Sequence, residues 1–248
     1  MIRKGLENEA QPLQYSYYLY RNGIVSKRSQ RTSSVNMYAK GGDGVQKGGH
    51  RMSRLDDFCK TEVCVVDTET TGLFGSPKDK IVDIAVCKIT LGEDKVEKIF
   101  SSVVGHDTSK WDDELKHSWI FENTDLTLEM VDKATPEPQV VSNVTRILNG
   151  ANVTSFNFSF DFDRFLYREP WSLQSKIIPF RCVMLASKDI CRIPGMYDDY
   201  KWPKLAEAYE MIVKGDPAGT EGTQAHRALS DAVMASHILL ELHKMGCY

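Results

Sequence analysis

The 248-residue chain lacks the sequence features that mark secreted and membrane-spanning proteins. Its six cysteines include no C-x-x-C pair and show no regular spacing, so no disulfide framework is indicated. No apolar run approaches the roughly 20 residues that a membrane-spanning helix needs, and the N-terminus lacks the apolar segment of a secretory signal. These absences predict a reduced, cytoplasmic protein without membrane contact.

The chain also lacks the basic charge that many nucleic-acid-binding proteins carry. Its formal net charge is −3. Residues 1–54 contain ten basic and three acidic residues, whereas the remainder contains 21 basic and 31 acidic residues. The acidic remainder argues against a long electrostatic groove, but it is compatible with a short acidic site that divalent cations neutralise.

Residues 1–54 have little periodicity and are rich in Gly, Ser, Lys and Arg, a composition typical of a disordered tail. A basic arm that helps to hold nucleic acid is one alternative. Another is a translated leader ahead of a true start at Met52, because the codons for residues 47–49 can contain a purine-rich ribosome-binding sequence. We therefore predict a domain over residues 55–248, and an intact mass of the endogenous protein tests whether residue 1 is present.

From residue 62 onward the hydrophobic pattern becomes regular. Apolar β-type runs separated by turn residues occur at 63–66, 81–89, 96–104 and 151–156. Helical patterns occupy 138–148, 159–167, 202–213 with Pro203 in the first turn, and 226–245. Strands followed by alternating helices and strands predict an α/β fold with a mixed sheet covered by helices.

Two carboxylates stand at the end of the first apolar run. Asp67 and Glu69 are two residues apart, so on a strand they point to the same face. Their mutual repulsion requires a compensating cation, and oxygen-rich clusters suit Mg²⁺ or Mn²⁺ rather than zinc. The alternative is a solvated polar turn at the strand end.

A third carboxylate, Asp161, borders a helical apolar stripe formed by four residues: Phe158, Phe162, Phe165 and Leu166. The alternative for Asp161 is a first-turn aspartate that favours the helix N-terminus. Asp163, two residues further, is better explained as a solvated residue or a local partner of the following turn.

The last predicted helix carries the most anomalous carboxylate. Asp231 occupies the apolar face that is formed by Ala228, Ala235, Ile238 and Leu242 at 3-4-3-4 spacing. A buried unpaired carboxylate costs several kcal/mol, so Asp231 must be hydrogen-bonded or bound to metal. His226 lies near the start of the same helix, where it suits a base that acts on water. Taken alone, a histidine at this position is more often an exposed helix-start residue.

Together these segments resemble the DEDDh group of 3′→5′ exonucleases, which includes bacterial DNA polymerase proofreading subunits, exonuclease X and RNase T. Residues 67–73 are similar to the D-x-E motif with its T-T-G-L continuation, residues 156–166 to H-N-x-x-F-D-x-x-F-L, and residues 226–232 to H-x-A-x-x-D-A. Residues 201–209 resemble the K-L-x-x-L/A-x-x-Y segment. One departure is Phe156, where many members have histidine, which puts substrate contacts at this position in doubt.

The resemblance implies a ribonuclease H-like fold with a five-stranded mixed sheet and helices on both faces. It implies that four carboxylates hold two Mg²⁺ or Mn²⁺ ions about 3.5–4 Å apart, that His226 is the base, and that nucleoside 5′-monophosphates leave from a 3′ end. The implied metal ligands are Asp67, Glu69, Asp161 and Asp231. Thr70 and Leu73 would lie beside the terminal nucleotide, although a turn role for Thr70 and a packing role for Leu73 are alternatives. Phe158 and Phe160 are expected in the core.

DNA is the favoured substrate, and an exoribonuclease that trims RNA 3′ ends is the first alternative. A second is a non-catalytic nucleic-acid-binding or polymerase-docking module on the same fold, which the presence of all five site residues disfavours. A DNA polymerase partner is compatible with the resemblance, but no polymerase- or clamp-binding peptide is recognisable, so a stand-alone enzyme is favoured.

Overall fold

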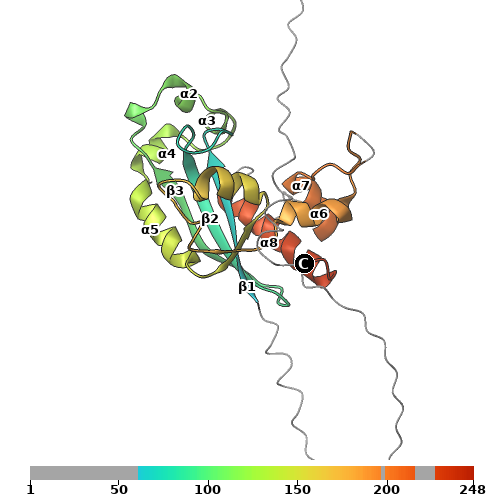
Figure 1. Cartoon of the computed structure of the whole chain (residues 1–248). Helices are drawn as coiled ribbons and strands as arrows, with labels where there is room; N and C mark the ends of the chain where they lie inside the picture. Colours follow the sequence, from blue (N-terminus) through green and yellow to red (C-terminus); the bar gives the residue numbers. More distant parts are fainter. Residues whose placement is uncertain (1–60, 197–198, 216–226) are drawn as a thin grey trace, which may run out of the picture. The chain divides into compact units, whose positions relative to one another are not determined.

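The computed structural model describes residues 61–196, 199–215 and 227–248 (Figure 1). Within these ranges the sheet has six strands in the order β4-β3-β2-β1-β5-β6. The strands β1 (Glu62–Thr70), β2 (Ile81–Thr90) and β3 (Val96–Gly105) form an antiparallel meander, and β5 (Asn152–Ser155) pairs parallel to β1. The mixed α/β architecture is therefore confirmed, and the strand count of five is corrected to six.

The difference in strand count comes from the edges of the sheet. β4 (Thr135–Pro136) pairs parallel to the end of β3, and β6 (Ile178–Pro179) pairs parallel to β5. Each contains two residues, which is too short for an alternating pattern to be visible in the sequence. Only the packing of neighbouring elements places them in the sheet.

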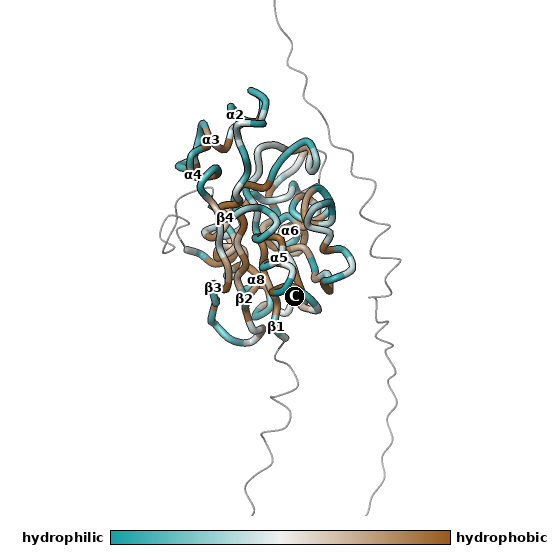
Figure 2. Tube along the Cα trace, turned by 90° about the vertical axis from the view of Figure 1, so that its left-hand side faces the viewer, coloured by the Kyte–Doolittle hydropathy of each residue, from teal (hydrophilic) through white to brown (hydrophobic). Residues whose placement is uncertain are grey.

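The alternation of side chains along β1 divides the core into two layers. Cys64 and Val66 pack on one face, in a cluster with the helix α5 (Glu137–Leu148) and the π-helix η3 (Ser159–Leu166). Val63 and Val65 point to the other face, where they pack with the long C-terminal helix α8 (Ala228–Lys244). Figure 2 shows the hydrophobic segments gathered on the strands and on the helix faces that cover them.

The remaining helices complete the two layers. On the α8 side lie α6 (Val183–Cys191), α7 (Leu205–Ala208) and the π-helical turn η4 (Tyr209–Val213), which share a hydrophobic cluster with α8. A third cluster packs under the turns η2 (Thr108–Lys110), α2 (Asp113–Lys116), α3 (Trp119–Asn123) and α4 (Leu128–Lys133). None of the helices in the described ranges combines the length and hydropathy required to cross a bilayer.

The boundaries of several predicted elements shift in the structure. The first strand extends beyond its apolar run to Thr70 and so includes both polar residues of the D-x-E segment. The helix predicted at 202–213 begins at Leu205, so Pro203 precedes it rather than lying in its first turn. The predicted N-terminal segment, with the proposed start at Met52, lies outside the described residues.

Candidate active site

Three carboxylates converge on the face of the sheet that α8 covers. Asp67 and Glu69 continue the series of Val63 and Val65 along β1, and Asp231 lies in the first turn of α8. One carboxylate oxygen from each of Asp67, Glu69 and Asp231 lies within 4.8 Å of the others. The prediction that Asp67 and Glu69 share a face is confirmed, and the helix that packs on that face supplies the third group.

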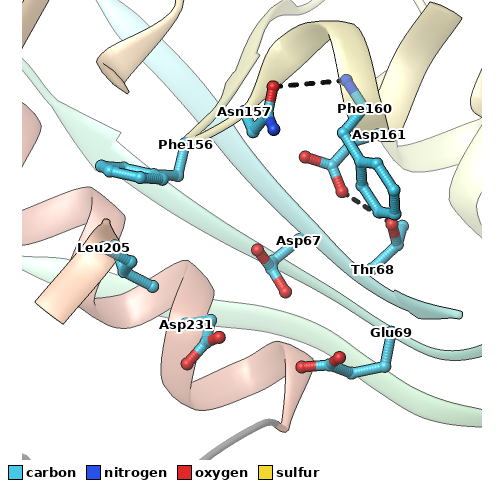
Figure 3. Close-up of a pocket in the computed structure, with 9 residues that line it drawn as sticks. All are labelled: Asp67, Thr68, Glu69, Phe156, Asn157, Phe160, Asp161, Leu205 and Asp231. Atoms are coloured by element: carbon cyan, nitrogen blue, oxygen red, sulfur yellow. Dashed lines mark hydrogen bonds between the residues drawn. The ribbon is translucent and has the colours of Figure 1, made fainter. Parts of the chain in front are cut away.

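Asp161 reaches the same cavity from η3, with a side chain that is 3% exposed. Its Oδ1 accepts a hydrogen bond from Thr68 Oγ1 at 2.6 Å. Figure 3 shows Asp67 between Asp161 on one side and Asp231 on the other. The cavity has a volume of about 150 Å³, which is large enough for solvent and small ions.

The start of η3 is fixed by the residue that follows β5. Asn157 Oδ1 accepts a hydrogen bond from the Phe160 backbone N–H at 3.4 Å, and the Asn157 carbonyl accepts one from the Asp161 N–H at 3.1 Å. The predicted apolar stripe of η3 is buried in the core, and Asp161, which borders this stripe, faces the cavity. The two hydrogen bonds to Asn157 and the burial of the apolar stripe together place the Asp161 carboxylate beside β1.

The cavity wall also contains apolar side chains, namely Phe156, Phe160 and Leu205. Phe158 is buried in the core as predicted. The same prediction for Phe160 is wrong in part, because its ring is only half-buried and lines the cavity. Phe160 stands two residues after Phe158, so helical spacing already placed it off the apolar stripe.

The four carboxylates have raised pKa values. Burial is the largest cause for Asp67, whose pKa is raised well above its ordinary value, with further contributions from Asp161, Asp231 and Glu69. Burial, followed by repulsion from Asp231, raises the pKa of Glu69 to about 8. Burial also raises the pKa of Asp161 to about 7, against the opposing Thr68 hydrogen bond, and that of Asp231 to about 6. Among the described residues, positive charge offsets only part of this repulsion.

An ion pair beside the cluster, absent from the sequence predictions, fixes the start of α8. Arg227 Nε donates to Asp83 Oδ2 at 2.8 Å, and Arg227 Nη1 lies 3.4 Å from Asp125 Oδ2. Asp83, which is 1% exposed, also accepts from the Ala228 N–H at 3.4 Å and so caps the helix. Arg227 is therefore committed to two other carboxylates, and it offsets only part of the negative charge near Glu69.

The donor set fits a divalent cation. Carboxylate oxygens are the ligands that Mg²⁺ and Mn²⁺ prefer, and the described residues that line the cavity include no Lys or Arg. Metal binding would remove the repulsion that raises these pKa values. The cluster can therefore hold divalent metal through Asp67, Glu69 and Asp231, with Asp161 facing the same cavity.

Four other predicted residues have different outcomes. Thr70 Oγ1 donates to the Gly72 carbonyl at 2.8 Å, which is the turn role offered as its alternative. Leu73 is 68% exposed, so its packing alternative is wrong. Asp163 does not line the cavity, and Arg168 Nε of the following turn donates to its carbonyl as the local role predicts, but its side chain accepts from Ser159 Oγ in the preceding turn at 3.0 Å. His226 lies outside the described residues, and its role stays a prediction.

Comparison with known proteins identifies the family. A family model described as "Exonuclease" (RNase_T) matches residues 64–239. The chain belongs to this exonuclease family, which confirms the predicted relationship. The match includes every cavity residue described above.

A curated relative is the 3′-5′ exonuclease DinG of Bacillus subtilis (strain 168), which is 30% identical over 190 residues. The match covers 74% of this chain and 18% of DinG, so the chain spans less than a fifth of that relative's length.

Two solved structures show the same fold. One, described as "3'-end specific recognition of histone mRNA stem-loop by 3'-exonuclease", has a TM-score of 0.54 at 18% identity and covers 76% of this chain and 84% of its own. The other, E. coli Exonuclease I in complex with a 5cy-dT13 oligonucleotide, has a TM-score of 0.50 at 12% identity. The match covers 75% of this chain and 41% of that structure's chain. These similarities confirm the ribonuclease H-like fold.

Proposed function

We propose that this domain is a metal-dependent 3′→5′ exonuclease that removes nucleoside 5′-monophosphates from DNA 3′ ends. The observation that supports this proposal best is the convergence of Asp67, Glu69 and Asp231 within 4.8 Å, in an acidic cavity that Asp161 also faces. A cluster of this kind is costly in a protein that does not bind cations. Family membership and the match to DinG point to the same reaction.

In the proposed reaction, Asp67, Glu69, Asp161 and Asp231 are the residues that would hold two Mg²⁺ or Mn²⁺ ions. Bound ions of this kind supply acidification of water and stabilisation of a leaving oxygen. His226 accepts a proton from the water that attacks phosphorus, the bond from phosphorus to the 3′ oxygen breaks, and the shortened strand keeps a new 3′-hydroxyl. Thr68 keeps the Asp161 carboxylate turned toward the cavity.

The walls of the cavity are suited to a nucleoside beside the carboxylates. Phe156, Phe160 and Leu205 supply apolar surface for a base or sugar beside the carboxylates. In the proposal, Thr70 and Leu73 lie beside the terminal nucleotide, and the hydrogen bond from Thr70 to Gly72 orients that turn.

A product assay tests the proposal. Matched 5′-labelled single-stranded DNA, duplex DNA and RNA are incubated with Mg²⁺, and we expect stepwise shortening from the 3′ end of DNA that stops when EDTA is added. Preferred shortening of RNA would support the exoribonuclease alternative, which the structural similarity to a 3′-exonuclease of histone mRNA also favours. Binding of nucleic acid without any shortening would support the non-catalytic alternative.

Two variants on one helix separate site chemistry from general effects. Asp161→Asn should abolish hydrolysis, whereas Asp163→Asn, which alters a half-buried carboxylate bonded to Ser159 outside the cavity, should retain it. Equal activity of the two purified variants would refute the site. His226→Ala should lower kcat more than it changes KM, and an effect on KM alone would remove His226 from the role of base.

A further inference from the structure

The loop between β1 and β2 holds two large apolar side chains in solvent. Leu73 is 68% exposed and Phe74 is 74% exposed. Isolated exposed apolar residues are common on proteins, but these two are adjacent and follow the carboxylate strand by only a few residues. Whether these side chains have a fixed position depends on the contacts that hold the loop backbone.

The loop is built around a buried carboxylate. Asp79 is 4% exposed, and its Oδ2 accepts hydrogen bonds from the backbone N–H groups of Phe74 (2.6 Å) and Gly75 (3.1 Å). A Cβ at Gly72 would lie 2.5 Å from Asp79 Oδ1, so the chain passes this carboxylate as closely as glycine permits. The backbone of Phe74 is therefore fixed, while its ring points away from this support.

The loop is also docked on η3, the helix that carries Asp161. The Ser76 N–H donates to the Arg164 carbonyl at 3.0 Å, and Arg164 Nη1 donates to the Leu73 carbonyl. Gly75, at φ +90°, approaches so closely that a Cβ would lie 2.5 Å from the Arg164 carbonyl oxygen. The exposed pair thus belongs to the same rigid unit as the cavity.

Positive charge accompanies these apolar surfaces. Lys78 Nζ lies 4.1 Å from the centroid of the Phe74 ring. The guanidinium carbon of Arg164 lies 5.7 Å from the centroid of Phe160, which lines the cavity. Aromatic rings flanked by cations are the usual elements of single-strand nucleic-acid binding, since bases stack on the rings and phosphates approach the cations.

On the basis of the proposed exonuclease function, we propose that Phe74 stacks on the base of the nucleotide that precedes the 3′-terminal one. Lys78 covers one face of the ring, and the high exposure of Phe74 leaves the other face open to a base. Arg164, between the loop and Phe160, contacts a backbone phosphate on the 5′ side of the scissile one. The surface therefore selects single-stranded 3′ ends, because a paired base cannot leave its duplex to stack here without a cost.

The test compares two substrates that differ only in the preceding nucleotide. One is a single-stranded oligothymidylate, and the other is the p-nitrophenyl ester of thymidine 5′-monophosphate, in which nitrophenol replaces that nucleotide. Phe74→Leu should lower kcat/KM on the oligonucleotide by about 5- to 100-fold, the range expected for loss of one base–aromatic stack, and should leave hydrolysis of the ester unchanged.

Two further variants control for fold and for apolar area. Phe74→Tyr keeps an aromatic ring and should retain oligonucleotide hydrolysis close to wild type. Ile178→Ala removes an apolar side chain that is 53% exposed on β6 and does not line the cavity. Ile178 pairs with Asn152, the first residue of β5, and the variant should change the kinetics on neither substrate.

The outcomes distinguish the two proposals. If the wild type hydrolyses both substrates and Phe74→Leu leaves the oligonucleotide kinetics unchanged, the stacking role alone is overturned. An equal loss on both substrates would also overturn it, because the ester has no preceding base to stack on Phe74. If the wild-type chain hydrolyses neither substrate, both the exonuclease function and the stacking role that depends on it are overturned.

Discussion

Glu69 tests whether the acidic cluster opposes folding until cations bind. Burial and repulsion from Asp231, Asp83 and Asp161 raise the pKa of Glu69 from 4.5 to about 8. In protein freed of metal with EDTA, Glu69→Gln removes this charge and keeps the shape of the side chain. We therefore expect the variant to be more stable than the wild type above pH 8.

The pKa shift sets the size and the pH range of the effect. Because the folded protein retains a proton that the unfolded chain has released, wild-type stability falls as pH rises from 4.5 to about 8. At about 1.4 kcal/mol per pH unit, the full cost of ionised Glu69 is about 5 kcal/mol. Because the neighbouring carboxyls share protons, only part of this cost belongs to Glu69. We expect the free energy of unfolding of Glu69→Gln to exceed that of the wild type by about 2–3 kcal/mol above pH 8. Below pH 4.5 the two proteins should have the same stability.

Urea unfolding in EDTA at about pH 5 and about pH 8.5 measures this difference. Glu122→Gln, an exposed glutamate on α3, is the matched control and should change stability little at either pH. Added Mg²⁺ should stabilise the wild type more than Glu69→Gln, because the variant has lost a ligand. A variant no more stable than wild type at the higher pH would refute the view that the cluster opposes folding.

Three further predictions concern the supports of the site. Gly75→Ala should destabilise the fold by about 1–3 kcal/mol more than Gly92→Ala in urea unfolding, since both glycines have φ near +90° but only Gly75 has atoms within 4 Å of the added Cβ. Equal losses would show that no close contact exists. Arg227→Ala leaves Asp83 buried without its cation and should cost about 3–5 kcal/mol at neutral pH, with a smaller loss at low pH, where protonation removes the charge. Thr68→Val removes a hydrogen bond to the carboxylate of η3 and should lower kcat/KM about 10-fold in a folded protein; unchanged kinetics would exclude a positioning role.

The elements with regular periodicity were predictable because each depends on local pattern. The meander strands, the helix α5 and the helix α8 appear close to their predicted positions. The edge strands β4 and β6 were missed, since two-residue pairings have no periodicity, and the turns η2 to α4 and the helix α6 were not predicted. Their positions depend on what they pack against rather than on their own sequence.

The same division applies to the candidate site. Asp67 and Glu69 could be placed on one face because side chains alternate along a strand, and Asp231 was conspicuous on an apolar helix face. The pairing of Thr68 with Asp161, and of Arg227 with Asp83, left no sequence signal, because these partners lie 93 and 144 residues apart. The position of Phe160 was available from helical spacing but was assigned to the core.

By itself, the sequence determined the chemical groups of this exonuclease domain, their order along the chain and the face of each element on which they lie. The tertiary structure decided which faces meet. The register of β1 against β2, the turn after β5 and the packing of α8 on the sheet bring Asp67, Glu69 and Asp231 together around a cavity that Asp161 also faces. The physical reason is that local periodicity fixes the direction of a side chain relative to its own element, whereas the distance between side chains of remote elements depends on the packing of the whole core.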